Sequence, residues 1–153
     1  MQSGDVLNMD MAASYGGYSA DLTRTVPVNG RYSPEQREIY QIVYDAQQAG
    51  ERQVKAGAPV KASSDSATAV ITAGLARLGL IESADAKIAP AVRKYANIGV
   101  RIEDDYIVTA AGFDRITSGA PREMDEIERE MAVRAPLTGR DSALIEAHKR
   151  IRP

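Results

Sequence analysis

Two aspartates that flank a tight-turn signal are the residues of this sequence best placed to do chemistry. Asp10 and Asp21 lie eleven positions apart, with Tyr-Gly-Gly-Tyr at 15–18 between them. Gly-Gly supplies the positive φ angles that a tight hairpin turn needs, so residues 5–15 and 18–28 are predicted to pair as strands. If paired positions sum to about 31–33, Asp10 lies opposite or nearly opposite Asp21, with Cβ atoms roughly 4.5–5.5 Å apart.

Two carboxylates held this close repel each other unless a proton or a cation lies between them. A divalent metal is the ordinary remedy, and carboxylate oxygens suit ions such as Mg²⁺, Mn²⁺ or Zn²⁺. The alternative is a solvated hairpin whose aspartates point outward or miss each other by one register step. Spacing alone leaves both interpretations open.

Composition narrows the class of protein. The 153 residues are 44% hydrophobic and 26% charged, which is ordinary for one globular domain. A net charge of -2 without a basic face gives no reason to expect a nucleic-acid or membrane partner. The absence of cysteine excludes disulfides, thiolate ligands and a cysteine nucleophile. Because the sequence has no signal-peptide pattern and no apolar run of about 20 residues, we expect a cytoplasmic protein.

Two helices are predicted after the hairpin and an Asn-Gly turn at 29–30. Ser33, Pro34 and Gln36 form a capping-box start, and Gly57 with Pro59 is a plausible stop. The expected buried stripe of this first helix is Ile39, Val43, Ala46 and Val54. A second helix is predicted over 64–78, with Val70, Ile71, Leu75 and Leu78 facing inward and Gly79 as the C′ residue.

Residues 97–117 are predicted to form a second hairpin that turns at Ala111-Gly112. Arg101, Glu103 and Asp105 alternate onto one face of its first strand, so that face is either solvated or a site. A third helix is expected after Pro121. The remainder, 134–153, is charged and is expected to be a loosely attached tail with a short helix at about 141–150.

Longer motifs carry a resemblance to a known family. Residues 10–40 read D-x-A-x-x-Y-x-G-Y-x-x-D-L-T-R-T-x-P-V-N-G-R-Y-S-P-x-Q-R-E-I-Y, 98–109 read I-G-V-R-I-E-D-D-Y-I-V-T, and 117–128 read T-S-G-A-P-R-E-M-D-E-I-E. In this order they resemble the pita-bread metallopeptidases, and within them the aminopeptidase P and prolidase group, which acts on Xaa-Pro bonds. The resemblance implies an α+β fold, a partial pita-bread fold with a curved antiparallel sheet and helices on one face.

The resemblance also implies a metal site. The family holds two divalent ions with two aspartates, one histidine and two glutamates; manganese is the first expectation, with cobalt or zinc as alternatives. Asp10 and Asp21 match the two aspartates, and Glu103 matches the last glutamate. Arg101 and Thr23 would support these ligands from behind. The implied substrates are peptides with proline at the second position.

The sequence departs from the family in what it lacks. The family's H-G-x-x-H and P-G-M-x-x-x-x-E-P stretches, which carry the histidine and the other glutamate, are missing between the two matching halves, as though residues had been deleted near 82–87. The sole histidine, His148, lies in the tail and is expected to be a solvated helix residue. The family's N-terminal domain is missing too. We therefore expect residues 1–133 to be an incomplete catalytic domain and 134–153 to be its tail.

Three interpretations follow. An ancestral Xaa-Pro peptidase with impaired hydrolysis is favoured, because three of the five ligands are retained. A non-catalytic pita-bread module that binds protein partners is the first alternative, and an unrelated structural domain with wet acidic strands is the second. Because lost strands would expose sheet edge and apolar surface, we expect either an oligomer or a poorly soluble product.

Overall fold

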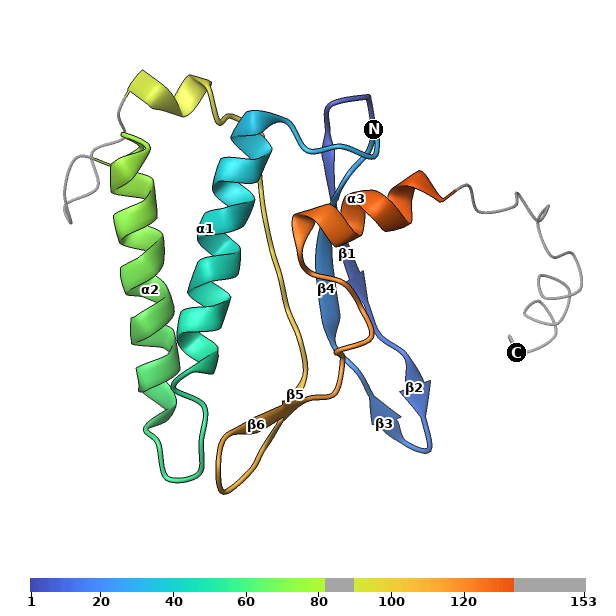
Figure 1. The fold of residues 1–153 in the computed structure, drawn as a ribbon, viewed down its shortest axis with the longest axis vertical. Helices are drawn as coiled ribbons and strands as arrows, with labels where there is room; N and C mark the ends of the chain where they lie inside the picture. The colour runs from blue at the N-terminus through green and yellow to red at the C-terminus, as the bar shows by residue number, and fades with distance from the viewer. Residues whose placement is uncertain (82–89, 134–153) are drawn as a thin grey trace, which may run out of the picture.

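The computed structural model describes residues 1–81 and 90–133 (Figure 1). The elements are β1 (Val6–Met11), β2 (Ser14–Tyr15), β3 (Tyr18–Ser19), β4 (Leu22–Pro27), α1 (Pro34–Glu51), α2 (Val60–Arg77), the 3-10 helix η1 (Pro90–Arg93), β5 (Tyr106–Val108), β6 (Phe113–Arg115) and α3 (Met124–Ala132). Every strand pair is antiparallel: β1 with β4, β2 with β3, and β5 with β6. The α+β prediction is confirmed.

The first hairpin forms where the sequence predicts it. Its tip is the β2–β3 pair, in which Tyr15 lies opposite Tyr18. The two residues between them, Gly16 and Gly17, have φ angles of 59° and 84°, which L side chains rarely adopt. In the longer β1–β4 pair, Val6 is opposite Pro27. Proline therefore stands at the end of its strand, as expected.

Helix α1 begins with the predicted capping box. The Gln36 N–H donates to Ser33 Oγ (3.2 Å), and the Ser33 N–H donates to Gln36 Oε1 (2.8 Å). The predicted buried stripe is only partly right, because Ile39 and Val43 are half-buried, while Tyr40 is 1% exposed.

The reason lies in what covers the helix. Tyr40 belongs to the core cluster with Tyr32, Ile102 and Ile127, and its hydroxyl donates to the Arg122 carbonyl (2.7 Å). The helix ends at Glu51, so Val54 and the predicted stop at Gly57 lie beyond it.

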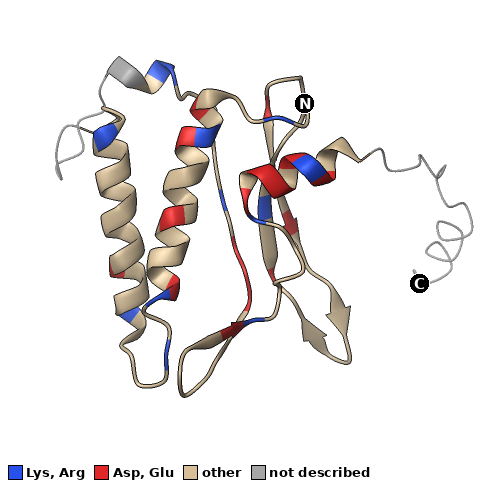
Figure 2. Ribbon diagram, viewed as in Figure 1, with Lys and Arg blue, Asp and Glu red and all other residues tan. Residues whose placement is uncertain are grey.

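Helix α2 begins at Val60, four residues before the predicted start, and packs closely on α1. A Cβ on Gly74 would lie 2.7 Å from Ile42 Cγ1, so the helices approach where a side chain is missing. None of the α2 residues is buried, and Ile71, predicted to face inward, is 37% exposed. The charged residues of α2 stand near its two ends (Figure 2). Its middle is therefore an uncharged, half-exposed surface.

The second predicted hairpin is shorter than expected. Only β5 and β6 pair with each other, and the Thr109 N–H closes the turn on the Gly112 carbonyl (2.9 Å). Residues 100–103 instead run between α1 and β4 (Figure 1), where Glu103 forms an isolated bridge with Thr23. The prediction failed because Ile102 packs into the core beside Tyr40, which directs its strand to β4.

Helix α3 follows Pro121 as predicted and buries Ile127. The predicted tail, its helix at 141–150, His148 and the deletion point near 82–87 all lie outside the described residues. Of the described helices, none combines the length and the apolar character that crossing a membrane requires.

Candidate metal centre

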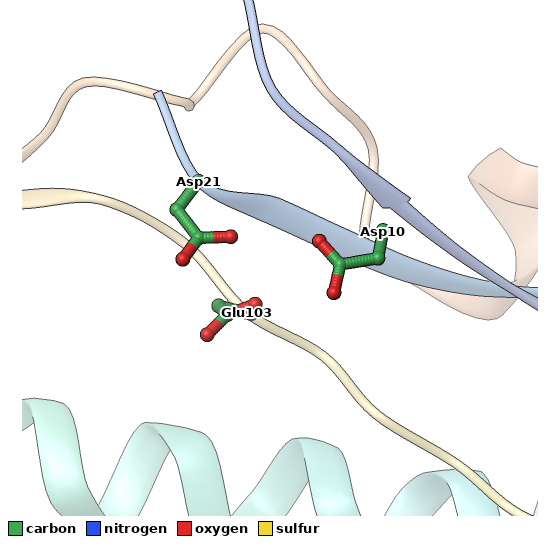
Figure 3. Close-up of side chains that lie close together, drawn as sticks. All are labelled: Asp10, Asp21 and Glu103. Atoms are coloured by element: carbon green, nitrogen blue, oxygen red, sulfur yellow. The ribbon is translucent and has the colours of Figure 1, made fainter. Parts of the chain in front are cut away.

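Three carboxylates from distant parts of the sequence converge beside the first hairpin. Asp10 lies in β1, Asp21 directly precedes β4, and Glu103 bridges to β4 from the other side. One carboxylate oxygen from each lies within 4.8 Å of the others. Figure 3 shows the carboxyl groups turned toward a common space. Within residues 1–81 and 90–133, this is the one group of three or more such side chains close enough to share an ion.

The register explains how the aspartates meet and corrects the simplest expectation. Asp10 is directly opposite Thr23, not Asp21, because paired positions sum to 33. Asp21 is therefore the diagonal neighbour of Asp10, two positions before Thr23 and on the same face of the hairpin. Diagonal neighbours have Cα atoms roughly 7–8 Å apart, and aspartate side chains turned toward each other close most of that gap.

Glu103 accepts hydrogen bonds from Thr23 and Arg101, the two residues that the family resemblance implies as supports of the ligands. Thr23 Oγ1 donates to Glu103 Oε2 (2.8 Å), and Arg101 Nη2 donates to the same oxygen (2.5 Å). Arg101 also reaches Asp10, with Nη1 3.4 Å from Oδ2. The guanidinium thus links two of the three carboxylates and leaves the other oxygen of Glu103 available to a cation.

The charges of the cluster are not balanced. The negative charge of Glu103 raises the pKa of Asp21 above its ordinary value, and desolvation and the charge of Asp10 act in the same direction. The hydrogen bond from Thr23 holds the pKa of Glu103 below its ordinary value; partial burial opposes this, and the hydrogen bond and positive charge of Arg101 support it. Three carboxylates against one arginine leave a surplus of negative charge, which a divalent cation would neutralise.

The donor set fits a hard divalent ion. All three side chains supply carboxylate oxygens, which Mg²⁺ and Mn²⁺ accept and Zn²⁺ tolerates. Oxygens on opposite sides of a Mg²⁺-sized ion are about 4–4.2 Å apart. The oxygens described here lie within 4.8 Å of one another, and the exposed side chains of Asp10 and Asp21 can adjust by small rotations. A cavity of about 290 Å³ between α1, α2 and residues 102–106 has Glu103 in its wall.

Arg24, near the cluster, escaped prediction from the sequence, and so did the contact that Asp105 makes with Asp21. Arg24 is 3% exposed and donates through Nη1 to the Glu103 carbonyl (2.8 Å). Asp105 Oδ2 accepts the backbone N–H of Asp21 (2.9 Å). The available signal for Arg24 was its place between two threonines in a strand: a charged residue that alternates onto the core side needs buried partners.

Comparisons with known proteins come to the same family from sequence and structure. The model of metallopeptidase family M24 matches residues 1–94, more than half of the chain. Xaa-Pro aminopeptidase 1 of Streptomyces coelicolor is 30% identical over 86% of this chain and 38% of the relative. Xaa-Pro aminopeptidase of Escherichia coli is 25% identical over 86% and 42%.

Among solved structures, aminopeptidase PepP of Pseudomonas aeruginosa superposes with a TM-score of 0.80 at 30% identity, covering 86% of this chain and 42% of that one. Zn-substituted Escherichia coli aminopeptidase P in complex with product gives 0.79 at 24% identity, with the same coverage. This likeness confirms the predicted pita-bread fold.

The chain spans about two-fifths of the length of these relatives. The alignment to the Streptomyces protein runs over 189 positions, whereas 86% of 153 residues is about 132. About 57 aligned positions therefore have no residue in this chain, which agrees with a deletion inside the matching region. With its family model, its fold and its relatives in accord, the chain belongs to metallopeptidase family M24.

Proposed function

We propose that Asp10, Asp21 and Glu103 bind a divalent cation, and that the chain is an Xaa-Pro aminopeptidase-type hydrolase whose activity is impaired. The observation that carries the proposal is the convergence of the three carboxylates in a chain of the M24 family. Manganese is the first choice of metal, with cobalt or zinc as alternatives. The proposed substrates are peptides with proline at the second position, as the names of the relatives indicate.

The residues divide the work as follows. When bound in such a site, divalent cations make a water molecule acidic enough to attack at neutral pH and polarise the carbonyl that is attacked. Asp10 and Asp21 supply ligands from the hairpin, and Glu103 supplies a third from the segment that bridges to β4. Thr23 and Arg101 fix the second oxygen of Glu103 and so set the orientation of its carboxyl group.

Impairment follows from the ligands that the sequence lacks. Three carboxylates can hold one hard cation with water completing its shell, but not the two ions of the family. A neutral imidazole ligand and a second glutamate, which assist proton transfer in the family, have no counterpart in the motifs of this chain. We expect the missing groups to reduce turnover more than they reduce the binding of a single cation.

Hydrolysis of an Xaa-Pro tripeptide by the purified chain, with Mn²⁺ or Co²⁺ and then with EDTA, tests this function. We expect turnover to be lower than that of an intact relative by well over tenfold, and any residual turnover to vanish with EDTA. Turnover within an order of magnitude of the relative would refute impairment. Equilibrium dialysis against Mn²⁺ tests the metal separately, and we expect one ion per chain.

A non-catalytic binding module is the second candidate, and the surface of α2 favours it. No residue of that helix is buried, and its middle is uncharged. We expect such a surface to associate, either with a second copy of the chain or with another protein. Sedimentation of the purified chain distinguishes the cases: a concentration-dependent oligomer supports self-association, whereas a stable monomer argues against it.

A further inference from the structure

The side chain of Arg24, in β4, uses every one of its hydrogen-bond donors. A guanidinium has five N–H groups, and all five have partners here. Nη1 donates to the carbonyls of Thr23 (2.9 Å) and Glu103 (2.8 Å), and Nη2 donates to Asp104 Oδ1 (2.6 Å) and the Ala120 carbonyl (3.0 Å). Nε donates to the carbonyl of Pro121 (2.8 Å). One buried side chain therefore joins β4, the segment that contains Glu103 and the segment before α3.

The segment that contains Glu103 has few other contacts that fix its alignment with β4. Thr23 and Glu103 exchange two backbone hydrogen bonds (3.3 and 3.1 Å), but this bridge is isolated and continues into no ladder. Two residues further along, the Thr25 side chain takes the place of ladder bonds, because its hydroxyl contacts the backbone N–H and carbonyl of Arg101. The alignment of Glu103 with β4 therefore depends on side chains.

The three consecutive acidic residues at 103–105 each make different contacts. The Glu103 carboxyl group faces Asp10 and Asp21. Asp104 turns the other way, has a fully buried side chain, and is fixed by Arg24 and by the Thr117 hydroxyl (2.6 Å). Asp105 turns back and accepts the backbone N–H of Asp21 (2.9 Å). The segment that supplies one proposed ligand thus also anchors the backbone of another.

We propose that Arg24 and Asp105 are positioning residues for the cation: Arg24 sets the distance of Glu103 from the hairpin, and Asp105 sets the backbone of Asp21. This inference rests on the proposed metal binding. Groups that hold the ligands of a metal commonly change its affinity 10–100-fold when they are lost. Lysine cannot replace Arg24, since its single ammonium lacks the planar set of five donors.

Mn²⁺ affinity of Arg24→Lys is the first test, with Ile127→Ala as the matched control. Ile127 is a core residue at 3% exposure, so its truncation lowers stability but removes no hydrogen bond of the three carboxylates or of Arg24. We expect Arg24→Lys to weaken Mn²⁺ binding 10–100-fold and the control to change it less than about threefold. Equal losses in both variants, or wild-type affinity in Arg24→Lys, would overturn the role of Arg24.

Asp105 offers a variant pair that keeps the test usable if Arg24→Lys does not fold. Asp105→Ala removes the acceptor for the Asp21 N–H, whereas Asp105→Asn retains an acceptor oxygen and removes the charge. We expect Asp105→Ala to weaken Mn²⁺ binding about tenfold and Asp105→Asn to restore most of the affinity. If both variants lose affinity equally, Asp105 acts through its charge and not through position.

Amide hydrogen exchange in metal-free protein separates this inference from the proposed function. The backbone N–H groups of Thr23 and Glu103 form the isolated bridge, so we expect Arg24→Lys to speed their exchange at least tenfold relative to amides in α1. Unchanged exchange would overturn the positioning role of Arg24 even if Mn²⁺ binds. Conversely, faster exchange in Arg24→Lys, in a protein whose wild type fails to bind Mn²⁺, would support the role of Arg24 in holding Glu103 against β4 and would refute the metal proposal.

Discussion

Two clusters of carboxylates and arginines lie on opposite sides of the segment at 103–105, and neighbouring residues of this segment belong to each. Glu103 joins the exposed cluster with Asp10, Asp21 and Arg101. Asp104 joins the buried one, where Arg24, Arg115 and Arg122 lie 2.6, 3.6 and 3.8 Å from its oxygens. Two adjacent carboxylates therefore have opposite surroundings, because successive side chains of an extended segment point to opposite sides.

The surroundings decide what each cluster needs. Burial disfavours the charged form of Asp104, but hydrogen bonds from Arg24 and Thr117 outweigh it, so the pKa of Asp104 lies below its ordinary value. In the exposed cluster the opposite holds for Asp21, whose pKa is raised by Glu103. In the buried cluster the Asp104 carboxylate thus finds its hydrogen-bond donors within the protein, whereas the exposed cluster gains from a ligand with positive charge.

Breaking the buried cluster is expected to have the largest effect. Asp104→Ala leaves Arg24 charged and buried without its carboxylate partner, which costs about 3–5 kcal/mol of unfolding free energy. Glu103→Ala removes a carboxylate whose side chain is 31% exposed, and we expect a loss of about 1 kcal/mol or less. Urea denaturation measures both. A loss as large in Glu103→Ala would show that the two clusters do not differ in this way.

Adding metal acts on the other cluster alone. At a Mn²⁺ concentration about 100 times the dissociation constant, the free energy of unfolding should rise by about 2.7 kcal/mol. Thermal unfolding with and without Mn²⁺ measures this gain. Asp10→Asn should lose most of it, whereas Asp65→Asn, which removes an exposed carboxylate on α2, should retain it. A similar gain in Asp10→Asn would place the bound ion elsewhere.

The pH dependence of stability should also separate the clusters. Because the pKa of Asp104 is lower in the folded than in the unfolded chain, its stabilisation is complete above about pH 3.9 and is lost as the pH falls through the folded-state pKa. In metal-free buffer below about pH 4, the free energy of unfolding should therefore fall more steeply with decreasing pH for the wild type than for Asp104→Asn. Urea denaturation at several pH values measures this.

Glu103→Gln provides the comparison for this measurement. The pKa of Glu103 is also lowered, first by Thr23, so its contribution has the same sign. We expect it to be the smaller of the two, because solvent screens an exposed carboxylate. If Glu103→Gln reduced the pH dependence of the free energy of unfolding below about pH 4 more than Asp104→Asn does, the exposed cluster would be its main source.

The smallest predicted effect concerns a single hydroxyl. Thr23→Val keeps the shape of a fully buried side chain but removes the hydrogen bond to Glu103 Oε2. One such bond contributes about 1 kcal/mol, so Mn²⁺ affinity should fall roughly fivefold. Isothermal titration measures this change. An unchanged affinity would show that Arg101 alone suffices to hold the Glu103 carboxyl group.

Local signals accounted for the parts that the sequence predicted well. The Gly16-Gly17 turn and the capping box of Ser33 and Gln36 each depend on neighbouring residues, and so could be read directly. The start of α2 could not, because its N-cap is Pro59, which makes no side-chain hydrogen bond. Spacing and resemblance were both needed to place Asp10, Asp21 and Glu103 in one candidate site.

Long-range contacts account for what the sequence did not predict. The segment at 100–103 pairs with β4 across about eighty residues of sequence, and its alternation alone was equally compatible with a hairpin. The same holds for Arg24, whose partners at 103–104 and 120–121 are brought together only by the fold. The sequence therefore predicted neither the burial of Arg24 nor its partners.

Helix α2 contacts α1 closely at Gly74, where the lack of a side chain makes room for Ile42. A methyl group there would collide with Ile42 and push α1 outward, and on the same rigid helix Gln47 Nε2 donates to Asp104 Oδ2 (3.0 Å). Displacing α1 would therefore pull at the residue next to Glu103. The packing of α2, which has no buried residue of its own, is thus connected through α1 and Gln47 to the residue next to Glu103.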